Sequence, residues 1–151
     1  MKSHVDDAAL HHLGGHLAVI HRRVNRAEEA SRLPHGLTPA QARVIRTLYR
    51  IDRPMQMGEL AVELDVVPRS VTSLIDELEP LHLVSRQADP GDGRSVLVAL
   101  TSTGQSLAPV LRAAHGRAVA SVLTPLDPTE IRVLAELLHR VAHTPNDDAT
   151  R

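Results

Sequence analysis

The sequence contains no cysteine, phenylalanine or tryptophan, and Tyr49 is its single tyrosine. The lack of cysteine excludes disulfide bonds, thiolate metal sites, cysteine nucleophiles and redox sensing by thiol oxidation. The scarcity of aromatic rings excludes the stacking platforms that bind single-stranded nucleic acids. Apolar runs are too short to cross a membrane, and Asp6 and Asp7 interrupt the N-terminus before a secretory signal could form. We therefore expect a cytoplasmic protein that does not associate with membranes.

The remaining composition is that of an ordinary globular protein. Of the 151 residues, 42% are hydrophobic and 23% are charged, and the formal net charge is −1. This length fits one compact domain, or one domain with a dimerisation appendage. A net charge near zero gives no overall basic field that would indicate a nucleic-acid partner.

Near the N-terminus, apolar residues recur at alternating steps of three and four. This spacing predicts a long helix with a coiled-coil-like apolar stripe. The stripe needs a cover, and a second subunit and the chain's own domain are both candidates. Its members are Leu10, Leu13, Leu17, Ile20, Val24 and Ala27.

The next segments predict a helix-turn-helix. Thr38 and Gln41 have the spacing of a capping box, which starts a helix that ends near Asp52. Two shorter helices are expected over residues 57–64 and from residue 68 to residue 78. The three-residue connection between them, with an inward valine, matches helix-turn-helix geometry.

A β-hairpin is expected directly after the helix-turn-helix. Residues 83–88 and 94–101 alternate between apolar and polar positions, and the turn sequence Asp-Pro-Gly-Asp-Gly at 89–93 separates them. A hairpin in this place is a wing.

Two further helices complete the chain. Thr101 caps the first of them, which Pro109 is expected to kink. Asp127 and Glu130 form a capping box at the start of the last helix. Its apolar positions are expected to face inward; they are Ile131, Leu134, Leu137, Leu138 and Val141.

Four segments of the chain, in order, resemble the MarR family of bacterial transcription regulators. Residues 89–101 (DPGDGRSVLVALT) resemble the family's wing, and residues 37–41 (LTPAQ) resemble the opening of its second helix. Residues 59–61 (ELA) and 71–79 (VTSLIDELE) resemble its helix-turn-helix core. The match runs from about residue 10 to residue 143.

The resemblance implies a mainly α fold with a small β-wing, built from a winged helix-turn-helix domain and an α-helical dimerisation domain. We assign residues 1–35 and 102–144 to dimerisation helices, residues 36–101 to the DNA-binding domain and residues 145–151 to a flexible tail. It further implies a homodimer whose first and last helices interlock on a pseudo-palindromic double-stranded operator. Such a protein is a repressor released by a phenolic or other anionic effector, without a bound cofactor.

The expected DNA contacts lie on the recognition helix and the wing. Arg69 has the donors to pair with guanine in the major groove, and Arg94 has the length and charge to enter the minor groove. Asp92 is expected to orient Arg94, and Arg86 to contact a phosphate. The full predicted set is Pro68, Arg69, Ser70, Thr72, Ser73, Arg86, Asp92 and Arg94.

The charge balance of this segment leaves a second reading open. Residues 54–101 contain three arginines and eight acidic residues. The family usually carries basic residues where this chain has Ser73 and Glu77, and glycine where it has His82. A winged-helix protein-interaction module that no longer binds DNA is therefore an alternative.

The ten histidines raise the possibility of a metal site. His12 and His16, like His139 and His143, are spaced i, i+4, which suits two ligands of one divalent ion. The alternatives are a metal-responsive repressor, surface or interface histidines, and a group that titrates near pH 6. An enzyme is not expected, because there is no HExxH motif, phosphate loop or Ser-His-Asp arrangement.

By resemblance, an effector pocket would lie between the dimerisation helices and the winged domain, where a buried arginine could hold a carboxylate. A closed core without a ligand is the alternative. The expected lining residues are His16, Ile20, Arg43, Arg46 and Thr47.

Overall fold

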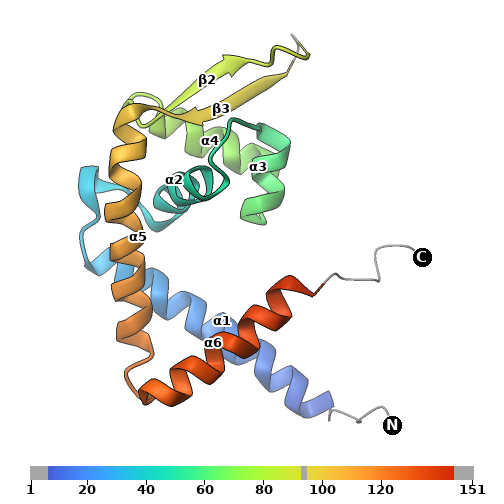
Figure 1. The fold of residues 1–151 in the computed structure, drawn as a ribbon, viewed down its shortest axis with the longest axis vertical. Helices are drawn as coiled ribbons and strands as arrows, with labels where there is room; N and C mark the ends of the chain where they lie inside the picture. Colours follow the sequence, from blue (N-terminus) through green and yellow to red (C-terminus); the bar gives the residue numbers. More distant parts are fainter. Residues whose placement is uncertain (1–6, 93–94, 145–151) are drawn as a thin grey trace.

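The fold is mainly helical with one small sheet, as the sequence predicts. A computed structural model describes residues 7–92 and 95–144. Figure 1 shows a winged part built from α2 to β3, joined by the long helix α5 to two helices, α1 and α6, that extend away from it. The elements in chain order are α1 (Asp7–Ala30), a 3₁₀ turn (Pro34–Gly36), α2 (Pro39–Ile51), β1 (Met55–Gln56), α3 (Met57–Leu64), α4 (Pro68–Leu78), β2 (Val84–Ala88), β3 (Val96–Leu100), α5 (Ser102–Val122) and α6 (Pro128–His143).

The capping residues read from the sequence set the helix starts. The Gln41 N–H donates to Thr38 Oγ1 at 3.3 Å, and the Thr38 N–H donates to Gln41 Oε1 at 2.8 Å, which completes the capping box of α2. Asp127 and Glu130 form the same reciprocal pair at α6. Because each cap satisfies N–H groups that a helix end leaves free, the starts of α2 and α6 are fixed locally.

The main core lies inside the winged part and continues onto α5. Helices α2, α3 and α4 bury aliphatic side chains against one another and against β3. With only Tyr49 among its partly buried neighbours as an aromatic, this core is built from aliphatic residues. Its fully enclosed large members include Ile45, Met55, Leu60, Leu64, Ile75, Leu78, Leu83 and Leu111.

The sheet has one strand more than the predicted hairpin. Strands β2 and β3 pair antiparallel, with Arg86 opposite Val98, and the two-residue strand β1 pairs with the other edge of β3. Strand β1 was not predicted from the sequence, because two residues are too few to show a period-2 pattern. Strand β1 ties the start of α3 to the base of the wing, and Met55 is fully buried there.

The helix-turn-helix connection differs from prediction in one respect. Asp65 takes the left-handed conformation that ends α3, with φ 50°. Val66 and Val67 are both exposed, at 36% and 59%, so the expectation of an inward valine is wrong. Leu64 and Val71, on the helices themselves, already fill the space beneath the turn.

The junction between the wing and α5 is tightly packed. Thr101 Oγ1 accepts from the Gly104 N–H at 3.1 Å and donates to the His82 carbonyl at 2.5 Å. A Cβ on Gly104 would lie 2.0 Å from the Leu83 carbonyl oxygen, so only glycine fits this first turn of α5. The helix then continues through Pro109 to Val122 as one element.

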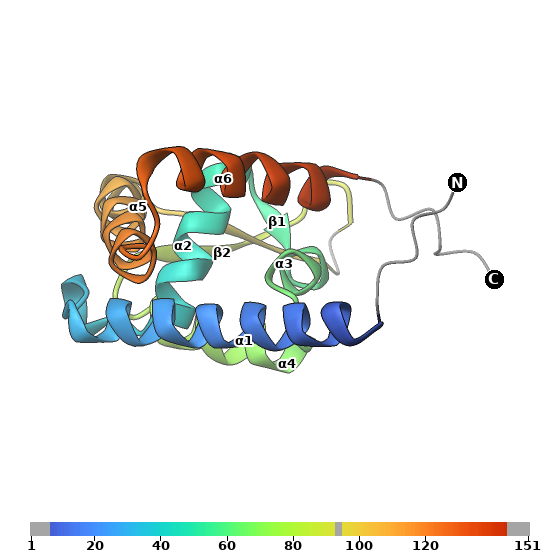
Figure 2. The ribbon, with the colours of Figure 1, turned by 90° about the horizontal axis from the view of Figure 1, so that it is seen from below.

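Helices α1 and α6 are largely uncovered in the single chain. The C-terminal part of α1 packs on α5, where Val24 meets Ala118 and Val122. The rest of its apolar stripe is exposed; its members there are Leu10, Leu13, Leu17 and Ile20. Figure 2 shows α1 and α6 projecting from α5 in the same direction.

The inward orientation expected for the last helix is wrong for the single chain. None of the residues of α6, Pro128–His143, is buried, and within the chain only Leu134 is half-buried among its apolar positions. Ile131, Leu137, Leu138 and Val141 are exposed. The periodicity identified an apolar face correctly, but this chain does not supply what covers it.

Candidate functional site

The first half of α4 presents a polar, exposed face. Its other face is anchored by Val71, Ile75 and Leu78, all buried in the main core. Of the residues predicted to contact DNA there, all are exposed except the half-buried Ser70; they are Pro68, Arg69, Ser70, Thr72 and Ser73. The hydroxyls of Thr72 and Ser73 donate to the carbonyls of Pro68 and Arg69 one turn earlier. The end of a helix thus displays one guanidinium and several hydroxyls toward solvent.

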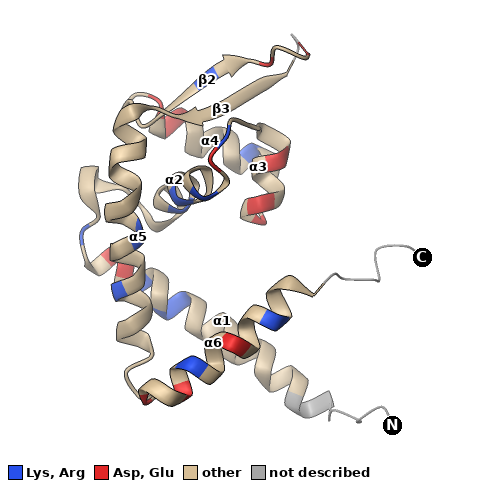
Figure 3. Cartoon of the chain, in the orientation of Figure 1, with Lys and Arg blue, Asp and Glu red and all other residues tan. Residues whose placement is uncertain are grey.

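The second half of α4 is acidic and engages Arg86 of the wing. The Arg86 guanidinium lies 2.5 Å from Asp76 Oδ1 and 2.6 Å from Glu79 Oε2. The hydrogen bond that Arg86 donates to Asp76, followed by the one it donates to Glu79, raises the pKa of Arg86 above its usual value. These pairs hold β2 against α4, and the phosphate contact by Arg86 stays a prediction. Figure 3 shows basic residues along α2 and acidic residues on α3.

The wing turn is organised by the carboxylate of Asp89. Its Oδ1 accepts from the Gly91 N–H at 2.8 Å and its Oδ2 from Gln56 Nε2 at 3.1 Å. These bonds hold the pKa of Asp89 below its usual value, the Gly91 N–H contributing most. Asp92 accepts from the Ser95 hydroxyl at 3.0 Å. Gly93 and Arg94, including the predicted minor-groove arginine, lie outside the described residues.

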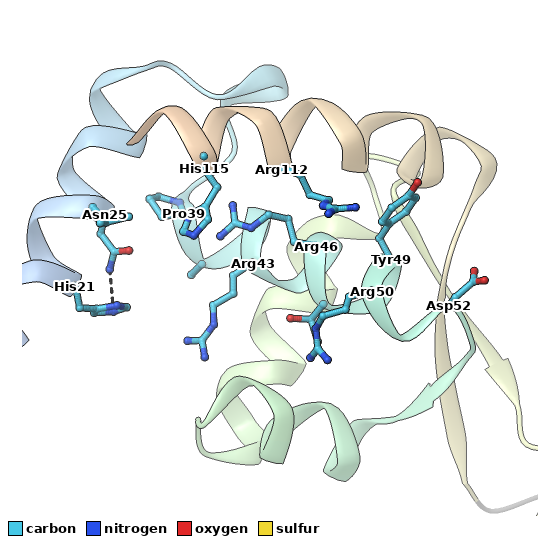
Figure 4. A pocket seen from close by; sticks show the side chains of 14 residues that line it. His21, Asn25, Pro39, Arg43, Arg46, Tyr49, Arg50, Asp52, Arg112 and His115 are labelled. Atoms are coloured by element: carbon cyan, nitrogen blue, oxygen red, sulfur yellow. Dashed lines mark hydrogen bonds between the residues drawn. The ribbon is translucent and has the colours of Figure 1, made fainter. Parts of the chain in front are cut away.

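A cavity of about 1120 Å³ lies where α1, α2 and α5 meet, beneath the winged part. Figure 4 shows arginine and histidine side chains entering it from these three helices. Among its charged lining residues cations predominate: four arginines face one carboxylate, and two histidines lie beside them. The charged and titratable members are His21, Arg43, Arg46, Arg50, Asp52, Arg112 and His115.

A buried carboxylate joins the three helices behind the cavity wall. Glu28 of α1 is only 1% exposed, and its Oε1 lies 2.6 Å from Arg46 Nη1 on α2. Its Oε2 lies 3.3 Å from Nδ1 of His115 on α5. A buried carboxylate requires a cation and hydrogen-bond donors; Arg46 of α2 supplies both at Oε1, and the His115 ring of α5 faces Oε2. Glu28 therefore links the helix predicted to dimerise to the winged part.

Two of the four cavity arginines have no acidic partner within the described part of the chain. Arg46 is paired with Glu28, and Arg50 with Glu63 at 2.6 Å. Arg43 and Arg112 form no ion pair with any described residue. The Arg112 guanidinium carbon lies 5.9 Å from the centre of the Tyr49 ring, in cation–π geometry. These two guanidinium groups are available to an anion.

The predicted effector residues fall into two groups. Arg43, Arg46 and Thr47 line the cavity, whereas His16 and Ile20 lie further toward the N-terminus of α1 and are not among its lining residues in the single chain. Arg112 and His115 also line the cavity and were not predicted from the sequence. Their positions were available, because both follow the buried Leu111 and Ala114 by one residue and so lie at the edge of the covered face of α5.

The histidine pairs predicted to bind metal are placed on exposed helix surfaces. His139 and His143 lie with ring centroids 4.2 Å apart, and His143 Nδ1 is 2.9 Å from the His139 carbonyl. Across residues 7–92 and 95–144, no three His, Asp or Glu side chains come close enough to hold a metal ion. The pair on α6 and the pair His12 and His16 on α1 therefore do not converge within one chain.

Within residues 7–92 and 95–144, no helix combines the length and the apolar character needed to span a bilayer.

Comparisons with known proteins agree on one family. A model described as MarR family matches residues 35–95. The HTH-type transcriptional repressor Rv2887 of Mycobacterium tuberculosis is 32% identical over 137 residues, which cover 87% of this chain and 95% of the relative. The reduced form of MarR from E. coli superposes with a TM-score of 0.77 and 26% identity, covering 85% of this chain and 95% of MarR.

A solved complex shows this fold on DNA. Mutant MarR from E. coli complexed with operator DNA matches with a TM-score of 0.72 and 26% identity, covering 85% of this chain and 92% of that one. These proteins are regulators rather than enzymes, in agreement with the prediction from the sequence. The chain belongs to the MarR family of HTH-type transcriptional regulators.

Proposed function

We propose that this protein is a dimeric repressor that binds a pseudo-palindromic operator and is released by a small anionic effector. The observation that carries the DNA-binding part is the exposed first half of α4, with Arg69 on a helix whose opposite face is locked in the core. A rigid helix of this kind, followed by a wing, places a side chain in a major groove reproducibly. Operator binding by a structural neighbour supports the same reading. We propose a cytoplasmic location for it, because a repressor must reach the operator that it binds.

Dimerisation through α1 and α6 is supported by their uncovered apolar faces. Leu13 is 54% and Leu137 50% exposed in the single chain, and both belong to continuous stripes. Monomeric soluble proteins rarely leave such contiguous apolar surface in water. A second copy of the same chain brings identical stripes and closes them by two-fold symmetry.

The effector part is supported by the cavity at the junction of α1, α2 and α5. It lies between the helices proposed to dimerise and the helices of the winged part. An anion held by Arg43 and Arg112 bridges α2 and α5. By favouring one arrangement of these helices, it shifts the spacing of the two α4 helices in the dimer.

A protein-interaction role is the second candidate, because Asp76 in the second half of α4 and Glu79 at its C-cap hold Arg86. Such a module would bind a basic partner and ignore duplex DNA. A metal-responsive repressor would need the α1 and α6 histidine pairs to meet across the dimer. Measuring duplex binding at low salt, and metal content after purification, separates these candidates from the main proposal.

We expect Arg69→Ala and Arg94→Ala each to weaken binding to a selected operator by about 1–3 kcal/mol, because each removes one groove contact. The measurement is fluorescence anisotropy of a labelled duplex at fixed salt. Arg117→Ala, which removes an exposed arginine from α5, is the matched control and keeps wild-type affinity. Wild-type affinity in both test variants would contradict the assigned interface.

A further inference from the structure

His115 is positioned between a buried carboxylate and the cationic cavity. Its Nδ1 is buried, faces Glu28 at 3.3 Å, and lacks a hydrogen-bond partner of good geometry among the described residues. The side chain as a whole is 41% exposed and belongs to the cavity lining. The ring therefore turns Nδ1 toward Glu28 and its remaining edge toward the open side.

Both nitrogens of the His115 ring face a group that needs a hydrogen-bond donor, and a neutral imidazole has only one N–H. Glu28 is 1% exposed and needs a donor at Nδ1, whereas an anion in the cavity needs a donor at Nε2. Neutral histidine carries one ring proton and can satisfy only one side; the other nitrogen then points a lone pair at a negative charge. Only the imidazolium donates on both sides.

The charge of the cavity leads to the same conclusion. The four lining arginines carry four positive charges. Asp52 carries one negative charge, and Glu28 and Glu63 bring two more through their ion pairs, which leaves one positive charge in excess. A proton on His115 adds a second. A cavity with two excess positive charges balances a doubly charged anion, and His115 is the residue type that gains a proton close to neutral pH.

We propose that the cavity binds a dianion, such as a sulfate, phosphate or dicarboxylate group, together with one proton that His115 takes up. This deepens the effector role proposed above and rests on it. Arg43 and Arg112 hold the anion from α2 and α5, and Nε2–H of His115 adds a third donor. The Nδ1–H then donates to Glu28, so ligand binding tightens the contact between α5 and α1.

Charged and titratable groups face His115 from three helices. From α1 it faces Glu28, with His21 further along the cavity wall; from α2, Arg46 and Arg43; and from its own helix, Arg112. The guanidinium groups keep their charge at all relevant pH values. His21 Nε2 pairs with the Asn25 amide at 3.1 Å, whereas His115 Nδ1 faces the buried Glu28.

The test is calorimetric titration of the full-length protein with sodium sulfate. Sulfate remains a dianion across the working pH range, and ionic strength is held constant with chloride. Titrations in buffers of different ionisation enthalpy count the protons taken up. We expect close to one proton per sulfate at pH 7.5, and a Kd that rises by roughly tenfold between pH 7 and pH 8.

Two variants assign the proton. His115→Asn keeps an amide donor toward Glu28 but cannot titrate, and is expected to bind sulfate weakly, with the same Kd at pH 6 and pH 8 and without proton uptake. His21→Asn is the matched control and retains both proton uptake and the pH dependence.

Two outcomes of the sulfate titrations would contradict the proposal, and they differ in what they leave standing. Sulfate binding that takes up no proton, or that loses its pH dependence in His21→Asn instead, overturns the proposal and leaves the ligand cavity in place. Failure of the wild type to bind sulfate at pH 6 overturns the proposal and also removes the support for an anionic effector. Operator binding, measured separately, is unaffected by either outcome.

Discussion

Leu13→Asp in α1 is expected to leave the protein monomeric and to weaken binding to a two-half-site operator by about 10²–10⁴-fold. Leu13 lies in the middle of the uncovered stripe and is 54% exposed in the single chain. In a symmetric dimer one substitution places two carboxylates in the apolar interface, where their charge is poorly solvated. The measurement is sedimentation equilibrium, followed by duplex binding at the same protein concentrations.

Val110→Asp provides the control for this substitution. Val110 is a comparably exposed apolar residue on α5, outside both stripes, so the same chemical change there should leave the dimer intact. Leu137→Asp, on α6, should reproduce the effect of Leu13→Asp. A Leu13→Asp protein that remains dimeric would show that α1 does not form the interface.

The second large effect is expected at Glu28, which joins three helices from a buried position. Glu28→Ala leaves the guanidinium of Arg46, only 14% exposed, without its counter-charge. Removing one member of a buried pair typically costs about 3–5 kcal/mol of stability. We expect a loss of this size in urea unfolding, measured at one fixed protein concentration because dimerisation also contributes to stability.

Two further variants separate the ion pair from side-chain size. Glu29→Ala removes the exposed neighbour and should change stability by less than about 0.5 kcal/mol. The double replacement of Glu28 and Arg46 by leucine removes both charges and should cost less than Glu28→Ala alone. If Glu28→Ala costs no more than Glu29→Ala, the proposed clamp between α1, α2 and α5 is wrong.

Local sequence patterns predicted the elements of the winged part well, because local interactions set their ends. The capping residues Thr38 and Asp127 started helices at the expected positions. Helices α3 and α4 begin and end at the residues that their apolar periodicity predicts. The turn at 89–93 separated two strands whose register follows from the hairpin. Each feature depends on residues within a few positions of one another.

What the sequence did not indicate depends on contacts between distant residues. The pairing of β1 with β3 joins Met55 to Val98, and no local pattern marks it. The ion pair between Glu28 and Arg46 crosses from α1 to α2. Glu28 lies outside the apolar stripe of the first helix, and a charged residue is rarely buried without a partner, so its burial cannot be predicted until that partner is known.

The inward orientation predicted for the last helix was also wrong because it depends on contacts that no local pattern reports. Its period correctly marked an apolar face that includes Leu137 and Leu138. Periodicity reports that a face is apolar, but it does not report whether the same chain or another copy covers it. In the proposed dimer a second copy covers the exposed α6 face. The predicted inward orientation therefore holds for the proposed dimer and not for the isolated chain.

The proposed regulator has three linked parts: the DNA-reading helix α4, the symmetric interface of α1 and α6, and the cationic cavity between them. Glu28 lies where they meet, since it contacts Arg46 of the winged part from a helix that also carries the uncovered stripe. An anion that engages Arg43 and Arg112 acts on the same three helices. Because the parts share helices, binding energy gained in the cavity changes the relative position of the reading helices.

The most direct test selects duplexes from a random pool with the wild-type protein at about 50 mM salt, and then determines the stoichiometry on the selected sequence by native mass spectrometry. The account predicts a pseudo-palindromic sequence with half-sites about one helical turn apart, bound by two chains per duplex. Recovery of no enriched sequence, or a complex with a single chain, would contradict it.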